Sequence, residues 1–225
     1  MYTKFVWFHG IIFGVSDNIV DKKFNEWTSG LEAKAARINV FNKIRDIPYM
    51  IVPELRGPDE GPSGILKKNC GSCQPKHWLL ARYFRELGMP VKYATYPFYW
   101  HAGKFITYPP ELKILMKSLP VTNHLALKAS IGHEWVLIDA TYDPPLGNVG
   151  FPVNKSWDGI NPTHNAVHPL EEILHNTPEE RVAYDAATRE RYTEFEKAAL
   201  AEFIPKLNAW FESLRLFSKP GERPD

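Results

Sequence analysis

The sequence predicts an α+β fold in which helices precede and follow a small antiparallel sheet. Three observations support this fold: amphipathic helical patterns over residues 31–46 and 73–88, strand-like alternation over residues 91–96 and 123–142, and a long helical pattern over residues 179–216. A chain of 225 residues is long enough to bury one sizeable core. We therefore expect one main domain with additions.

The first predicted helix covers residues 31–46. Its apolar residues recur at spacings of three and four, with charged residues between them: Leu31, Ala35, Ile38, Phe41 and Ile44. The helix should end before Pro48. Residues 53–64 that follow are rich in proline, glycine and charge, and they are predicted to form a surface loop.

The second predicted helix begins at Cys73, after a short glycine- and serine-containing loop, and ends at Gly88 just before Pro90. The first amide groups of a helix lack intrahelical partners, and the helix dipole places partial positive charge beside them. An ionised sulfur is stabilised in that position. Cys73 is therefore a candidate nucleophile.

The next segments are predicted strands that supply a base and a carboxylate. Residues 91–96 alternate as one strand, and residues 123–142 form two strands joined at residues 130–132. Acyl transfer through a thioester needs an activated sulfur, an imidazole to exchange protons, and a group that holds the imidazole in the right tautomer. Cys73, His124 and Asp139 are the candidates for these three roles.

Two long irregular segments and a helical region complete the chain. Residues 97–110 are crowded with aromatic side chains and residues 144–169 with proline, glycine and asparagine, and both are predicted to shape a groove around the thiol. Core packing explains the aromatic run equally well. Residues 179–216 are predicted to be helical and to kink or divide at Pro205.

These motifs, taken together, resemble the transglutaminase-like superfamily of cysteine enzymes over about residues 31–142. The family's first motif is matched by Cys73, Leu79, Leu80, Arg85, Leu87, Gly88, Met89, Pro90 and Val91, and its second by His124, Trp135, Asp139, Ala140 and Thr141. The chain departs from the family pattern at Leu125 and Ala126, where Ala-Trp is usual, and at Lys92, where arginine is usual. Neither departure removes a catalytic group.

The resemblance implies a papain/transglutaminase-like core in which the helix that bears the nucleophile packs on an antiparallel sheet. It implies that Cys73 is the nucleophile, His124 the general base and acid, and Asp139 the orienting carboxylate. We expect residues 1–169 to form the catalytic domain and residues 170–225 a helical extension packed on it. No cofactor or metal is implied.

The expected function is a cysteine-dependent acyl-transfer enzyme that acts on a peptide or small amide, with hydrolysis slightly favoured over transamidation. Two alternatives remain open. Cys70 and Cys73 form a CxxC pattern, which occurs in dithiol redox proteins. The fold could also serve as an inactive binding module with the C-terminal helices as its partner surface. If the protein is an acyl-transfer enzyme, Cys70 is expected to be a neighbouring structural thiol. It could form a reversible disulfide with Cys73 that blocks the nucleophile under oxidation.

Each site residue has a rival reading. His133 competes with His124 but is expected to face solvent at the turn. Asp139 could instead cap a turn through Thr141, with Asp143 as a weaker substitute carboxylate. A zinc site would use Cys70, Cys73 and His77, but no second ligand pair follows. Candidate donors to an oxyanion are the Cys73 amide and the side chains of Gln74 and Asn69.

Composition excludes some partners. A formal net charge of +1 and a pI of about 7.8 give no basic footprint for nucleic acid or an anionic membrane. The apolar residues 5–15 are too few to span a bilayer and are predicted to form a buried strand or loop. Two cysteines so close in sequence favour a reducing cytoplasm. Residues 218–225 are predicted to fray, and the oligomeric state is left open.

Overall fold

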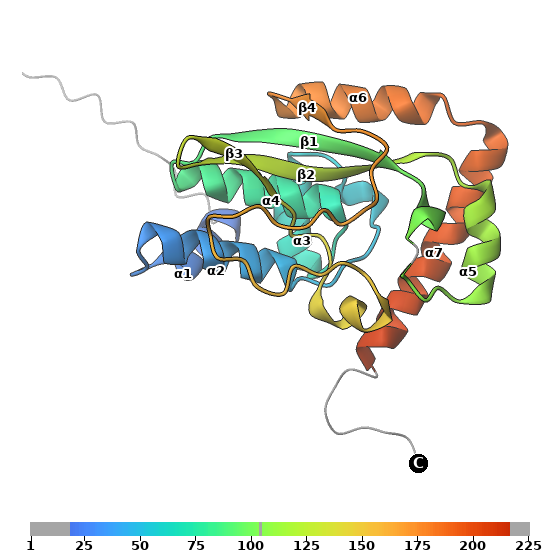
Figure 1. The fold of residues 1–225 in the computed structure, drawn as a ribbon, viewed down its shortest axis with the longest axis horizontal. Helices are drawn as coiled ribbons and strands as arrows, with labels where there is room; N and C mark the ends of the chain where they lie inside the picture. Colours follow the sequence, from blue (N-terminus) through green and yellow to red (C-terminus); the bar gives the residue numbers. More distant parts are fainter. Residues whose placement is uncertain (1–18, 104, 217–225) are drawn as a thin grey trace, which may run out of the picture.

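The computed structural model describes residues 19–103 and 105–216 (Figure 1). The predictions made for residues 5–15 and 218–225 lie outside these ranges. The longer helices are α1 (Ile19–Thr28), α2 (Ala33–Arg45), α3 (Glu60–Lys68), α4 (Cys73–Glu86), α5 (Pro110–Leu115), α6 (Pro178–Glu190) and α7 (Glu194–Leu216). Short 3-10 turns are η1 (Pro53–Leu55), η2 (Trp100–Ala102), η3 (Met116–Ser118) and η4 (Pro144–Val149).

Within the described residues, four antiparallel strands form one sheet in the order β3-β2-β1-β4. They are β1 (Val91–Phe98), β2 (Thr122–Ile131), β3 (Glu134–Ile138) and β4 (Ile173–His175). β2 and β3 join through Gly132 and His133, which both have positive φ, and such a two-residue turn matches the natural twist of a hairpin. The predicted α+β class and the predicted antiparallel hairpin are confirmed.

The elements lie in layers around this sheet (Figure 1). α4 packs on one face, with α1, α2 and α3 beyond it, while α6 lies over the opposite face near β1 and β4. The first core cluster fills the space between α2, α4 and the sheet. Its fully buried residues include Phe41, Ile44, Leu79, Leu80, Phe84, Leu125 and Leu127. Burying each such side chain contributes roughly 1.5–3 kcal/mol to stability, so α4 is held firmly against β2.

A second core cluster forms where α7 packs beside α5 and η4 (Figure 1). Its fully buried residues include Leu112, Leu146, Phe203, Leu207 and Phe211. Cys73 belongs to the first cluster, whereas Phe98 and Trp100 belong to the second. The candidate site therefore lies where the two clusters meet. No helix within the described ranges is both long and apolar enough to cross a membrane.

The prediction of a surface loop over residues 53–64 is wrong, because η1 and most of α3 occupy this region. Packing accounts for the helix. Ile65 is fully buried, and a β-carbon added at Gly61 would lie 2.9 Å from the Leu55 carbonyl oxygen and 3.4 Å from Pro75 Cα. Glycine here permits close contact between α3 and α4, so it does not mark a loop.

Pro205 does not divide the C-terminal helical region, because α7 runs without interruption from Glu194 to Leu216. The break falls earlier, between α6 and α7. There the Thr193 hydroxyl accepts a hydrogen bond from the Glu196 amide, and the Glu196 carboxylate accepts one from the Thr193 amide. This reciprocal capping box starts a new helix at Glu194, and burial of Phe203 and Leu207 holds the helix together around the proline.

Candidate active site

Cys73 is the first residue of α4, and its side chain is 8% exposed. The preceding Ser72 has an extended backbone and makes no side-chain cap hydrogen bond. A β-carbon at Gly71 would lie 2.9 Å from side-chain atoms of both Ile65 and Pro75, so a larger residue on the approach to the helix would have to displace them. The sequence therefore places the thiol at an uncapped helix start, as predicted.

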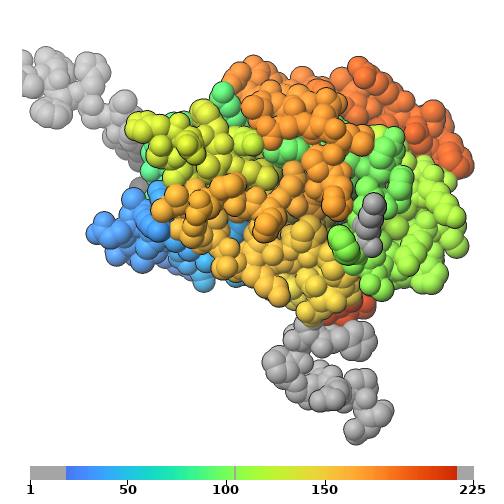
Figure 2. Space-filling model, in the orientation of Figure 1, coloured from blue at the N-terminus to red at the C-terminus, as the bar shows by residue number. Residues whose placement is uncertain are grey.

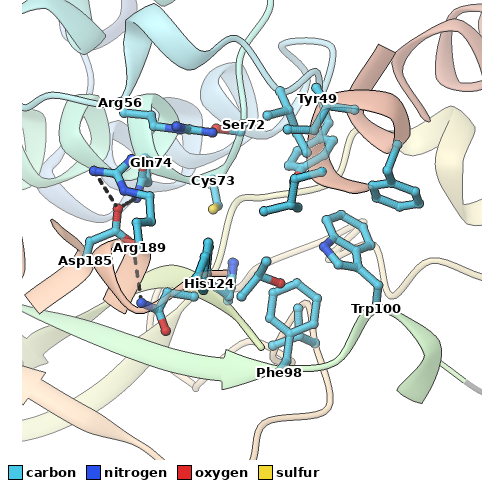
Figure 3. Close-up of a pocket in the computed structure, with 18 of the residues that line it drawn as sticks. Tyr49, Arg56, Ser72, Cys73, Gln74, Phe98, Trp100, His124, Asp185 and Arg189 are labelled. Atoms are coloured by element: carbon cyan, nitrogen blue, oxygen red, sulfur yellow. Dashed lines mark hydrogen bonds and ion pairs between the residues drawn. The ribbon is translucent and has the colours of Figure 1, made fainter. Parts of the chain in front are cut away.

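His124 lies near the start of β2, opposite Tyr96 of β1, and is 2% exposed. Its Nε2 donates a hydrogen bond to Asp139 Oδ2 over 2.8 Å. Because Nε2 is occupied in this way, Nδ1 is the ring nitrogen left to exchange a proton with sulfur. Figure 3 shows the Cys73 sulfur pointing toward His124.

Electrostatics couples the three predicted residues. Burial lowers the pKa of His124, but the charge and hydrogen bond of Asp139, with smaller contributions from the Cys73 side chain, raise that pKa to about 10. Burial raises the pKa of Asp139, yet the charge and hydrogen bond of His124 hold it well below its ordinary value. The imidazole is therefore stabilised as a cation between sulfur and carboxylate.

Asp139 follows β3 directly and is held in place by several backbone groups. Its Oδ2 also accepts a hydrogen bond from the Ala166 amide over 2.8 Å, and its Oδ1 accepts one from the Thr141 amide over 3.1 Å. Capping of the turn and contact with the imidazole are thus not alternatives for Asp139. One carboxylate accepts hydrogen bonds from both the Thr141 amide and the His124 ring. Its own amide donates to the Thr163 hydroxyl over 2.9 Å.

The irregular segment around residues 150–170 covers this carboxylate. It supplies the Ala166 amide and the Thr163 hydroxyl, and Asn154 Nδ2 donates to the Asp139 carbonyl over 2.9 Å. In Figure 2 the segment lies across the visible face, between the N-terminal helices and the β2–β3 hairpin. Asp139 is only 1% exposed as a result. The sequence predicts that residues 144–169 shape a groove around the thiol. Of these residues only Val167 lines the pocket beside Cys73, and the segment mainly serves to bury Asp139.

His77 is a buried histidine that the sequence motifs did not assign to the site. Its Nδ1 donates to the Cys73 carbonyl over 2.8 Å, and its Nε2 accepts a hydrogen bond from the Ala140 amide over 3.1 Å. Burial lowers the pKa of His77 to about 4, so the ring is neutral. Its Nε2 lies 3.7 Å from Asp139 Oδ1, but a neutral ring makes no ion pair there. His77 therefore ties the start of α4 to the residue after Asp139.

Lys76 is a second buried residue of α4 that ties the helix to the same loop. Its Nζ donates to the Arg45 carbonyl over 2.9 Å and to the Thr141 carbonyl over 2.7 Å. Burial lowers the pKa of Lys76 to about 7. The positions three and four residues after Cys73 thus both connect α4 to residues 140–141. This spacing places both side chains beside Cys73 on the helix surface, but no local pattern identifies their partners in residues 140–141.

The thiol opens into a pocket of about 310 Å³. In Figure 3, Arg56, Gln74, Asp185 and Arg189 lie on one side of Cys73 and His124, and Phe98 and Trp100 on the other. β1, η2 and β2 supply part of the wall, α6 and α7 supply another part, and the start of α4 and several loop residues complete it. The predicted groove near the aromatic run is therefore present. The contribution of α6 and α7 was not predicted.

The rival residues lie elsewhere. His133 is exposed at the hairpin turn, as predicted. Asp143 accepts hydrogen bonds from the Tyr49 amide and from Arg215. Asn69 is the left-handed residue that ends α3 and does not line the pocket, whereas Gln74 does.

The alternatives based on Cys70 gain no geometric support. Cys70 is half-buried, does not line the pocket, and has a pKa raised by burial. Within residues 19–103 and 105–216, no group of three His, Cys, Asp or Glu side chains is arranged to hold a metal ion. His77, the third proposed zinc ligand, already uses both ring nitrogens in hydrogen bonds.

Comparisons with known proteins add one structural likeness. No protein-family model matches the sequence, and no curated protein matches it. Among solved structures, the chain is similar to a protein from Cytophaga hutchinsonii described as a "putative cysteine protease", with 19% sequence identity and a TM-score of 0.38. The similarity covers 57% of this chain and 38% of that one.

Proposed function

We propose that this protein is a cysteine-dependent acyl-transfer enzyme that breaks an amide bond through a thioester at Cys73, on a papain/transglutaminase-like core. One observation carries the proposal. A buried imidazole, that of His124, is held by Asp139 over 2.8 Å and stands between that carboxylate and a thiol at a helix start. Sulfur, imidazole and carboxylate in this order are the groups that acyl transfer requires.

In the proposed reaction, His124 Nδ1 accepts the thiol proton and the Cys73 sulfur attacks the carbonyl carbon of the amide. The tetrahedral intermediate collapses as the carbon–nitrogen bond breaks, and His124 returns the proton to the leaving amine. Water then attacks the thioester with His124 accepting its proton, and the carboxylic acid leaves as the thiol reforms. Asp139 stays ionised throughout, because its low pKa keeps it a carboxylate beside the imidazolium.

The developing oxyanion would be stabilised at the start of α4. No intrahelical partner exists there for the amides of Cys73 and Gln74, and no side chain of the described residues caps them. The Gln74 side chain lines the pocket and is oriented by a 3.1 Å hydrogen bond to Asp185. Tyr49 also lines the pocket, and burial, followed by the Cys73 charge, raises its pKa well above the ordinary value. It therefore stays a protonated donor.

We propose hydrolysis, slightly favoured over amine transfer. The pocket of about 310 Å³ is of a size that suits a small ligand or a short peptide segment. A substrate is accordingly a peptide or a small amide. Product analysis with and without an added primary amine decides between the two reactions.

The experiment is a panel of peptide, glutamine and small-amide substrates, with intact-mass measurement of the quenched enzyme. A thioester adduct on Cys73 together with release of amine supports the proposal. Cys73→Ser should abolish both signals, and the matched Cys70→Ser variant should leave turnover largely intact. Loss of turnover on replacing Cys70 would favour a dithiol redox protein. The binding-module reading would be favoured by absence of any adduct on the panel while Cys73 remains no more reactive than Cys70.

A further inference from the structure

The pocket beside Cys73 has two ends of different chemistry. Figure 3 shows Arg56 and Arg189 on one side of the Cys73 and His124 pair, and Phe98 and Trp100 on the other. A substrate that places its reacting carbonyl at the sulfur can therefore extend toward both ends. The chemistry of each end restricts what the substrate carries there.

The first end, which we call the cationic end, consists of Arg56, Asp185 and Arg189. Asp185 is its one carboxylate and is shared, because Arg181 and Arg189 each lie 3.4 Å from it. Gln74 and Asn123 also donate to Asp185, over 3.1 and 3.3 Å. Arg181 does not line the pocket, so the two guanidinium groups and one carboxylate that do line this end leave it with one net positive charge.

Arg56 is the member of this group without an acidic partner. Its side chain is partly buried on the pocket wall, and among the described residues no carboxylate lies within 4.0 Å of its guanidinium. Burial and repulsion from Arg189 lower the pKa of Arg56, and the more distant charge of Asp185 only partly opposes them. A partly desolvated guanidinium beside another cation is unfavourable, and an anionic ligand would relieve that cost.

Lys197 contributes little to this imbalance. It lines the pocket but is exposed, and its Nζ lies 2.7 Å from Glu194 Oε1. Its charge is therefore both screened by solvent and paired. Lys197 provides a matched control cation at the edge of the same pocket.

The second end is aromatic. Trp100 packs edge-on against Phe203 with ring centroids 5.2 Å apart, and Phe98 packs against Trp100 at 5.3 Å. Leu200, Ile204 and Val167 line the same wall. Such a surface binds aromatic or aliphatic groups through burial of apolar area.

We propose that the pocket selects acyl substrates that carry a carboxylate on one side of the reacting bond, bound by Arg56, and an aromatic or aliphatic group on the other. A guanidinium fork matches the planar carboxylate with two parallel hydrogen bonds. The carboxylate belongs either to an acidic side chain or to a chain terminus, and the test separates these sources. The inference rests on the proposed function only in taking Cys73 as the reacting atom.

The first test compares two thiol reagents that differ in one charge. Iodoacetate and iodoacetamide both form a carbon–sulfur bond as the carbon–iodine bond breaks and iodide leaves. The rate of alkylation at Cys73 is measured with each by peptide mass spectrometry, and their ratio cancels changes in thiol reactivity. In Arg56→Gln the iodoacetate-to-iodoacetamide ratio should fall about tenfold, as expected for loss of one nearby, partly desolvated charge.

The control is Lys197→Gln, which removes the paired and exposed cation. Its ratio should stay within about twofold of the wild-type value. An Arg56→Gln ratio as unchanged as that of Lys197→Gln overturns the proposal. Arg56→Lys should keep most of the wild-type iodoacetate-to-iodoacetamide ratio. That result would show that the fall in Arg56→Gln comes from the lost charge and not from a loss of the fold. This test needs no turnover, so its result is independent of whether the proposed function holds.

The second test identifies the source of the carboxylate. Matched peptides with glutamate or glutamine beside the reacting bond, each with a free or an amidated C-terminus, are compared by kcat/KM. Preference for glutamate assigns an acidic side chain, and preference for the free terminus assigns a terminal carboxylate. In either case Arg56→Gln should remove the preference. Equal turnover of charged and neutral peptides overturns the inference while leaving the proposed reaction intact.

Discussion

Replacing Asp139 by asparagine gives the sharpest test of how the site is held together. The side chain keeps its shape but loses its charge. In the native protein Asp139 accepts from His124, Ala166 and Thr141. An amide has one oxygen and an NH₂ group, so an asparagine that keeps the bonds to His124 and Ala166 turns a donor toward the Thr141 amide.

The expected magnitude follows from the His124 pKa. Its rise from 6.5 to about 10 corresponds to about 5 kcal/mol of preference for the cationic imidazole, and Asp139 is the leading cause that raises it. Without that charge, burial should bring the pKa of His124 down by more than one unit. We expect kcat/KM to fall by about 10²- to 10⁴-fold, because His124 no longer holds the right tautomer and charge.

The assay combines amide turnover with an NMR titration of the His124 ring nitrogens. A raised folded-state pKa contributes stability that is present below pH 6.5 and is lost as the pH rises toward 10. Asp139→Asn should abolish this alkaline loss. Asp143→Asn is the matched control, because Asp143 contacts Tyr49 and Arg215 instead of His124, and it should leave the His124 titration in place. An Asp139→Asn enzyme with near-native kcat/KM and an unchanged His124 pKa would refute the reasoning.

Three further predictions concern residues around the pair. Lys76→Met should remove a pH dependence of stability. Folding lowers the pKa of Lys76 from 10.5 to about 7, so between these pH values the unfolded chain binds one proton more than the folded chain. In urea titrations, the stability of the wild type relative to the variant should therefore rise with pH by up to about 1.4 kcal/mol per pH unit. No such slope would show that Lys76 titrates normally. His77→Phe should lower the free energy of unfolding by about 1–3 kcal/mol. His77→Asn should partly restore it, because asparagine can still donate to the Cys73 carbonyl. If both variants are as stable as the wild type, His77 does not stabilise the start of α4. Tyr49→Phe should lower kcat more than it raises KM if the phenol supports the oxyanion, whereas a change in KM alone would assign it to substrate binding.

The helix starting at Cys73, the hairpin and the spacing of its polar residues could be predicted because each rests on a local pattern. Helical periodicity places Leu79, Leu80 and Phe84 toward the sheet, and they are fully buried there. The glycine at position 132 marks the hairpin turn through its positive φ. These local signals were sufficient to propose His124 and Asp139 as partners.

The features that the sequence did not predict depend on contacts between segments that are distant along the chain. His77 and Lys76 looked like ordinary helix residues, but His77 contacts Ala140 and Lys76 contacts Thr141, more than 60 residues away. The helix α3 was missed because Gly61 serves packing there instead of chain flexibility. The cationic end of the pocket joins Arg56 to residues of α6, and no local pattern could pair them.

The central claim is that folding joins the Cys73 sulfur and the His124 imidazole into one proton-sharing pair. The most direct measurement is the rate of iodoacetamide labelling at Cys73 and Cys70 near pH 7, in the wild type and in His124→Ala. Wild-type Cys73 should react at least about tenfold faster than Cys70, because a thiolate paired with an imidazolium is the reactive form, and the variant should lose this difference. Equal, slow labelling of both cysteines in the wild type would contradict the account.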